Sequence, residues 1–180
     1  ICKCVADIEY QAFSGCVRLN TVTFNAVNCS NPKTYEYVLF KDSQLKSLII
    51  GEQVKSIPAY LAWGQKQLTS ITIPNSVASI GDNAFFCCNQ LTEVVLPQSL
   101  TSIGTYAFCF CFGLKTIDIP NSVTNLGGCC FAQCTNATSL KIGSGVNTIP
   151  SNAFERCYSL TSVVIPKNVN LIKNYAFADC

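Results

Sequence analysis

Cysteine is the residue type in this sequence with the widest possible chemistry. The 180-residue chain holds 13 cysteines and no histidine. Thiolates bind zinc or act as nucleophiles, but a reactive thiolate needs a neighbouring base or cation that lowers its pKa. Histidine is the usual base and the commonest metal ligand. The composition therefore disfavours a cysteine hydrolase and a mixed cysteine–histidine metal site.

Three closely spaced cysteine pairs are the candidates for an all-thiolate zinc site: Cys2 with Cys4, Cys109 with Cys111, and Cys130 with Cys134. None has the paired Cys-x-x-Cys arrangement that is typical of structural zinc. We predict no metal site, no cofactor and no catalytic residue.

A 23-residue repeat sets the elements that position these residues. Leu68, Leu91 and Leu114 begin units that share apolar residues at positions 1, 4, 6, 10, 13, 17, 18 and 21. The alternation at positions 4 and 6 predicts a short strand that a proline at position 7 ends, and the Val-x-x-Ile step predicts a second extended stretch. A turn, as a single helical or 3₁₀ turn, then closes the coil. One coil cannot bury its own apolar face, so we predict a solenoid of stacked coils with in-register parallel strands.

The whole chain is predicted to be one domain of such units. Their bounds are 1–18 (partial), 19–44 (irregular), 45–67, 68–90, 91–113, 114–136, 137–159 and 160–180. Extra residues in a solenoid loop outward, so we expect the irregular unit to project a segment that includes the Asn28 sequon, Pro32, Tyr35, Tyr37 and Phe40. In the next unit, Trp63 is predicted to fill a gap in the phenylalanine column, which we place at Phe13, Phe85, Phe108, Phe131, Phe154 and Phe177.

Six cysteines share position 21 and form a second column: Cys16, Cys88, Cys111, Cys134, Cys157 and Cys180. Neighbouring parallel strands lie about 4.8 Å apart, whereas the Cβ atoms of a disulfide lie about 3.5–4.5 Å apart. Pairing between neighbouring coils would distort them, so we predict a column of buried, reduced thiols. Disulfides stay possible for the other seven cysteines: Cys2, Cys4, Cys29, Cys87, Cys109, Cys129 and Cys130.

The unit L-x-x-I-x-I-P-x-x-V-x-x-I-G-x-x-A-F-x-x-C resembles the leucine-rich repeat of the BspA-like family of surface proteins from bacteria, treponemes and parasitic protists. The resemblance covers the chain and is closest from Leu68 to Cys180. It implies a right-handed leucine-rich-repeat solenoid that is non-enzymatic and lies at the cell surface or is secreted. It also implies adhesion to host or matrix proteins such as fibronectin, or to neighbouring cells.

Positions 3 and 5 of each unit point away from the core and form one extended face. The predicted protein-binding residues are Ser47, Ile49, Ser70, Thr72, Glu93, Val95, Thr116, Asp118, Ser139, Lys141, Ser162 and Val164. Strands also favour such residues for their own sake, which is the alternative explanation. Glu93 and Asp118 follow one another on neighbouring strands as a hydrolytic pair would, but we interpret them as solvated surface and expect no enzyme.

Charge, hydropathy and glycosylation sequons limit the classes of partner and the cellular location that we expect. The net charge of +2 offers no basic stripe for nucleic acid, and the sequence has no apolar run of the roughly 18 residues needed for membrane insertion. Asn28 and Asn136 begin glycosylation sequons, which favours an exported protein. An architectural, self-assembling component of a surface coat or fibre is the alternative function. Neither end completes a coil, so we expect further repeats or a neighbouring chain to cover the ends.

Overall fold

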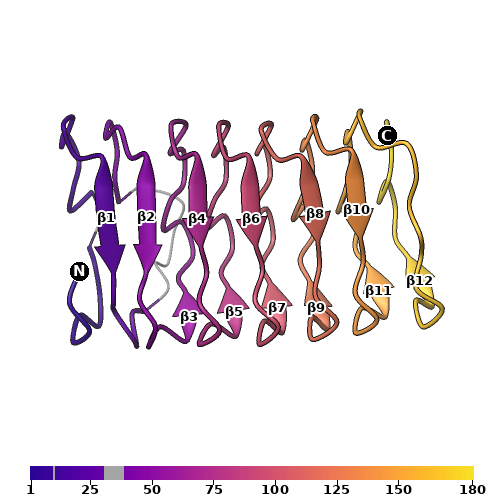
Figure 1. The fold of residues 1–180 in the computed structure, drawn as a ribbon, viewed down its shortest axis with the longest axis horizontal. Helices are drawn as coiled ribbons and strands as arrows, with labels where there is room; N and C mark the ends of the chain where they lie inside the picture. The colour runs from indigo at the N-terminus through magenta and orange to yellow at the C-terminus, as the bar shows by residue number, and fades with distance from the viewer. Residues whose placement is uncertain (10, 31–38) are drawn as a thin grey trace.

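The computed structural model describes residues 1–9, 11–30 and 39–180, and these coil into a parallel β-solenoid. The two termini lie at opposite ends of its long axis (Figure 1). The described residues contain no helix, and hence no helix long and apolar enough to cross a membrane. The predicted leucine-rich-repeat solenoid with in-register strands is confirmed.

The longer strands run side by side in Figure 1: β1 (Thr21–Phe24), β2 (Ser47–Ile50), β4 (Ser70–Thr72), β6 (Glu93–Val95), β8 (Thr116–Asp118) and β10 (Ser139–Lys141). All pairs are parallel, and residues at equal repeat positions face each other, so that Ile71 lies opposite Leu48 and Val94. Hydrogen bonding is interrupted between β6 and β8, which leaves a four-stranded sheet β1-β2-β4-β6 and a pair β8-β10.

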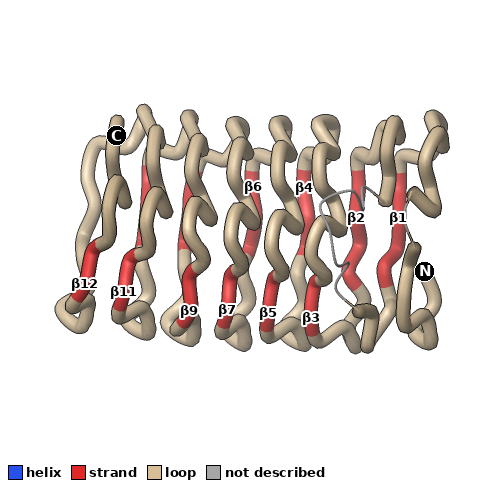
Figure 2. The backbone as a smooth tube through the Cα atoms, turned by 180° about the vertical axis from the view of Figure 1, so that it is seen from behind, coloured by secondary structure: helices blue, strands red, loops and turns tan. Residues whose placement is uncertain are grey.

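The predicted second extended stretch forms a second row of short strands: β3 (Ser56–Ile57), β5 (Ser79–Ile80), β7 (Ser102–Ile103), β9 (Asn125–Leu126), β11 (Thr148–Ile149) and β12 (Leu171–Ile172). Strands β3-β5-β7-β9 form one sheet and β11-β12 another. Because each coil from unit 45–67 to unit 137–159 contributes one strand to each row, both rows run together along the solenoid axis (Figure 2).

Tight turns close each coil where a helical turn was one expectation. Two residues per coil have left-handed backbone, for example Asn83 (φ 56°) and Cys87 (φ 59°). In these turns, successive backbone amides donate alternately within the coil and to the next coil. The Phe86 amide donates to the Asn83 carbonyl within the coil at 3.2 Å, and the Phe85 amide donates to Ala107 of the next coil at 2.8 Å. The turns thus satisfy the backbone without a helix and join the coils on this side too.

The phenylalanine column runs through the core, and the structure corrects its membership. Phe85, Phe108 and Phe131 stack with ring centroids 5.1 Å apart. Phe40 does not project outward as predicted, because it is buried and its ring stacks on Phe13 at 5.2 Å, which makes it a member of the column. The predicted segment with Pro32, Tyr35 and Tyr37 lies outside the described residues.

Trp63 does not fill the gap in the column, contrary to the prediction. Its ring stacks on Phe86, outside the core, at 5.8 Å. The Ala62 amide donates to Ala84 of the next coil as the Phe85 amide does to Ala107, so Ala62 holds the phenylalanine position. Leu61 at the preceding position is fully buried. A leucine one residue earlier therefore supplies the missing apolar volume.

Gly127 tests how closely the coils pack. A Cβ atom there would lie 2.3 Å from the Thr105 nitrogen of the preceding coil, whereas a Cβ on Gly128 would meet only the Ser151 oxygen at 3.4 Å. We expect Gly127→Ala to lower the free energy of unfolding by about 3 kcal/mol, because backbone must shift to admit the methyl group. Gly128→Ala is the matched control and should change it by less than about 1 kcal/mol. Equal losses in urea denaturation of the two variants would contradict this account.

Candidate functional site: the strand face

The strand face is the surface formed by the outward side chains of the longer strands. Along β4, Ser70 and Thr72 are exposed while Ile71 between them is buried, as the two-residue period of a strand requires. All the predicted contact residues lie on this face, and all except the half-buried Ser47 are exposed. The structure therefore brings the predicted set together on one surface.

Isolated aliphatic side chains project from a mostly small and polar strand face. Ile49 is 49% exposed, Val95 62% and Val164 81%. Thr21 and Thr23 of β1 extend the face by one further coil. The sequence prediction omitted these two threonines because unit 19–44 is irregular, although its strand alternation was a usable signal.

A cleft of about 250 Å³ opens in the strand face where β6 and β8 are not hydrogen-bonded. Its lining comes from both strands and the segment after β6: Glu93, Val94, Val95, Leu96, Gln98, Thr116 and Asp118. Figure 1 shows the two strands side by side. The otherwise flat face thus has a depression near its middle, beside the exposed Val95.

Glu93 and Asp118 flank this cleft, but their surroundings do not suit a hydrolytic pair. Both side chains are exposed, and Asp118 forms an ion pair with Lys141 at 3.2 Å. A general acid at neutral pH needs an apolar, buried carboxyl, which neither residue provides. Neither carboxylate at this cleft therefore has the surroundings of a general acid.

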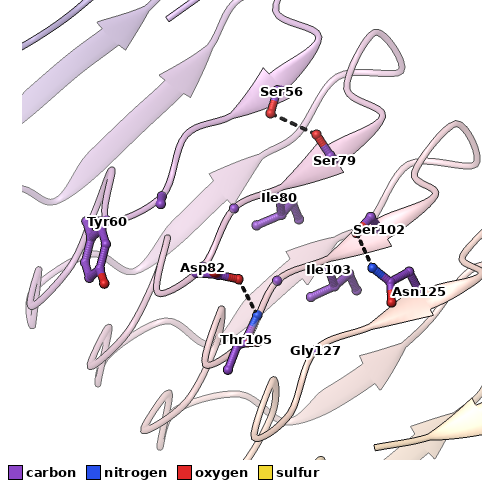
Figure 3. A pocket seen from close by; sticks show the side chains of 13 residues that line it. Ser56, Tyr60, Ser79, Ile80, Asp82, Ser102, Ile103, Thr105, Asn125 and Gly127 are labelled. Carbon is purple, nitrogen blue, oxygen red and sulfur yellow. Dashed lines mark hydrogen bonds between the residues drawn. The ribbon is translucent and has the colours of Figure 1, made fainter. Parts of the chain in front are cut away.

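An open groove of about 550 Å³ runs along the shorter strands (Figure 3). One side carries Ser56, Ser79, Ser102 and Asn125, which share a repeat position. The Ser79 hydroxyl donates to Ser56 at 2.8 Å, and the Asn125 amide donates to Ser102 at 3.2 Å. These side chains therefore bond to one another across neighbouring coils.

The other side of the groove is built by Tyr60, Asp82 and Thr105. An Asp82 carboxylate oxygen accepts from the Thr105 amide at 2.7 Å, which ties one coil to the next. Burial, and secondarily the Asp82 charge, raise the pKa of Tyr60 above its ordinary value. The groove presents hydroxyl, amide and carboxylate groups, without a nucleophile paired to a base.

The position-21 thiols form a hydrogen-bonded column. Cys88, Cys111, Cys134 and Cys157 are fully buried. The Cys111 thiol lies 3.2 Å from the Phe85 carbonyl oxygen of the preceding coil. The same contact, at 3.2–3.5 Å, is made by Cys88, Cys134, Cys157 and Cys180. A carbonyl has two lone pairs, so it accepts the thiol as well as the amide within its own coil.

Cys16 and Cys180 depart from the predicted burial because both are exposed. They belong to the first and last described coils, each of which has a packed neighbour on one side only. A thiol of this column is covered by its neighbouring coils, so burial is incomplete at both positions. All thirteen cysteines are free thiols in the structure.

Gln65 takes the thiol position in unit 45–67, a substitution that the sequence prediction missed. Its side chain is buried, and its amide nitrogen donates to the Phe40 carbonyl at 3.0 Å, the same contact that the thiols make. The Ser43 hydroxyl donates to the Gln65 side-chain oxygen at 2.8 Å. Both polar ends of the glutamine are therefore satisfied inside the core.

The remaining cysteines show no reactive arrangement. Burial raises the pKa of Cys109 and Cys130 above the ordinary thiol value, and it raises that of Cys129, which the Tyr106 hydroxyl partly offsets. Raised pKa values keep thiols protonated and poorly nucleophilic. Within residues 1–9, 11–30 and 39–180, no three cysteine, aspartate or glutamate side chains gather as a metal site would require.

Both glycosylation sequons are at the surface. Asn28 and Asn136 are exposed, and the hydroxyl of Thr138 in the second sequon donates to the Lys115 carbonyl at 3.4 Å. Asn136 lies in a turn between coils, outside the strand face.

The sequence profile of the BspA type leucine rich repeat region matches this chain in six copies, over residues 1–62 and 59–180. The chain belongs to this BspA-type family. No curated protein sequence matches the chain significantly.

Solved structures of two leucine-rich repeat proteins and of a vaccine antigen have a similar fold. The chain is 29% identical to a leucine-rich repeat protein of Bacteroides ovatus, with a TM-score of 0.73. The match covers 97% of this chain and 38% of the other, so this chain spans less than half the length of that protein. It is 25% identical to the Treponema pallidum leucine-rich repeat protein, with a TM-score of 0.69, over 93% and 67% of the two chains. The pneumococcal vaccine antigen PcpA, at 17% identity and a TM-score of 0.56, shares the fold over 97% of this chain and 62% of its own.

Proposed function

We propose that this chain is a non-enzymatic protein-binding module of a cell-surface or secreted protein, and that the strand face is its contact surface. Membership of the BspA-type family supports a binding role. Exposed carboxylates and protonated, buried thiols support the absence of catalysis. The partner is a protein of a host, a matrix or a neighbouring cell, because a net charge of +2 offers little attraction to nucleic acid.

The single observation that carries this proposal is the cleft between β6 and β8 in an otherwise flat, exposed face. Protein interfaces place an apolar anchor near the centre and surround it with polar residues. Val95 is the exposed aliphatic beside the cleft, Thr72 pairs with it on β4, and Thr116 and Asp118 line the same cleft. The Asp118–Lys141 ion pair adds charges of both signs to the rim.

Binding to immobilised fibronectin tests the proposal. We expect Val95→Lys to raise the Kd about tenfold, which corresponds to about 1.4 kcal/mol, because a charge then occupies the apolar anchor. The matched control is Val17→Lys, since Val17 is 60% exposed but lies in a turn outside the strand face. The control should bind as the unmodified chain does.

Two results would count against this function. Equal affinity of the Val95 and Val17 variants would place binding elsewhere on the molecule. Filaments of the purified chain at micromolar concentration, together with no capture of fibronectin or of cells, would favour the architectural alternative. Antibody labelling of unpermeabilised cells tests the surface location separately.

A further inference from the structure

Five partly exposed aromatic side chains form a contiguous patch on the turns, away from the strand face. We call it the turn patch, and it consists of Trp63, Phe86, Tyr106, Phe110 and Phe112. Phe86 contacts Trp63, Tyr106 and Phe110 with ring centroids 5.8, 6.3 and 5.3 Å apart. Phe110 in turn meets Phe112 at 5.9 Å. The patch spans three successive coils.

The fold does not require these aromatic residues, and the later coils of the same chain show this directly. Ala132 occupies the repeat position of Phe86, Gln133 that of Phe110, and Thr135 that of Phe112. The coil that contains them keeps the same turns and hydrogen bonds. The aromatic side chains are thus additions to a turn that forms without them.

Two residues of the patch have left-handed backbone. Tyr106 (φ 57°) and Phe110 (φ 61°) occupy the two left-handed positions of their coil. Asparagine or glycine adopts this conformation at lower cost, as Asn83 and Gly64 do at the corresponding positions. Tyr60 and Tyr175 hold the position of Tyr106 in other coils, so the conformation belongs to the repeat, and the contacts between aromatic rings are what set the patch apart.

We propose that the turn patch is a second binding surface, which receives an apolar segment of a protein partner that carries an acidic residue. Trp63 and Phe86 are nearly parallel at 8°, so each ring covers a face of the other. The Phe86–Phe110 and Phe110–Phe112 pairs meet edge to face, at 76° and 86°. A sugar binds by stacking on an open ring face, and these contacts leave few open faces. Apolar side chains also pack against ring edges, so the arrangement favours a peptide over a sugar.

Positive charge at the rim of the turn patch favours an acidic residue in the partner segment. Lys66 is exposed in the same coil as Trp63 and forms none of the ion pairs found in the described chain. At the other end, Tyr106 and Phe110 border a hollow of about 280 Å³ that Glu155 and Arg156 also line. Arg156 is already paired with Glu155 and Asp179, at 3.6 and 3.3 Å. Lys66 lines a hollow together with Trp63, and Lys41 and Asp42, whose charges are opposite, line the same hollow. This end of the patch therefore carries one surplus positive charge.

Selection from a phage-displayed library of random linear peptides tests the proposal. We expect the selected peptides to be rich in Leu, Phe and Trp with an Asp or Glu. The test variant borrows residues from other coils of this chain: Phe86→Ala, Tyr106→Asn, Phe110→Gln and Phe112→Thr. It should bind the selected peptides at least about tenfold more weakly, and Lys66→Ala should remove most of the salt dependence of binding.

Two further variants keep the outcome decisive. If the fourfold variant unfolds, Phe110→Gln with Phe112→Thr replaces it, and a thermal melt verifies its fold. Val95→Lys must leave peptide binding unchanged, so this proposal can fail while the strand-face proposal stands, and the reverse. Peptides that bind the patch variant equally well would overturn the proposal. The proposal would also be overturned if the unmodified chain dimerised and the patch variant did not, because a second copy would then occupy the patch. Binding to an oligosaccharide array that depends on the patch would overturn it in the same way.

Discussion

Phe108→Ala is expected to lower the free energy of unfolding by about 4 kcal/mol. Phe108 is fully buried, and its ring stacks between Phe85 and Phe131 at 5.1 Å on both sides. Alanine would leave a cavity that rigid coils on either side cannot fill. A loss of this size is a large share of the stability of an ordinary domain, so partial unfolding at 37 °C is expected.

The chain itself supplies the compensating variant. Unit 45–67 carries Leu61 and Ala62 where the regular units carry Ala-Phe, and both residues are fully buried. Ala107→Leu combined with Phe108→Ala reproduces that pair and should recover about half of the loss. Urea denaturation measures all three proteins. A double variant as unstable as Phe108→Ala would show that Leu61 does not replace the missing ring.

Alkaline unfolding is the second large effect that we expect, and the buried thiols cause it. Burial raises the pKa of Cys157 to about 12, and it raises the pKa values of Cys111 and Cys134 well above the ordinary thiol value of 9.0. Below pH 9 these thiols are protonated in the folded and unfolded chains alike, and their contribution to stability is complete. Above pH 9 the unfolded chain releases protons that the folded chain retains, so stability falls until the folded pKa is reached.

Each such thiol lowers the free energy of unfolding by up to about 1.4 kcal/mol per pH unit above pH 9. Several together should unfold the chain cooperatively before pH 12, which circular dichroism during a base titration measures. The matched comparison is Cys157→Ala, whose stability should fall less steeply with pH although it is lower at pH 7. A free energy of unfolding that stays constant up to pH 11 would contradict the burial of these thiols.

The repeat period was enough to predict the solenoid, the strand register and the strand face. Leu48, Ile71 and Val94 recur every 23 residues and pair with one another in the structure. Alternation within each strand then decides which side chains face outward, as at Ser70 and Thr72. Both inferences depend on burial that repeats along the chain, and such a pattern is visible in one sequence.

The departures from the repeat pattern could be interpreted only from the tertiary structure, because they depend on which side chains meet between adjacent coils. Spacing alone could not assign Phe40 to the phenylalanine column, since its unit departs from the period, and it suggested Trp63 for a gap that Leu61 fills. Nor could it show that a buried Gln65 makes the contact of a thiol. The cleft between β6 and β8 and the turn patch likewise arise between coils, from side chains about one repeat apart. A sequence period specifies which positions are buried, but only packing between coils decides which atoms meet there.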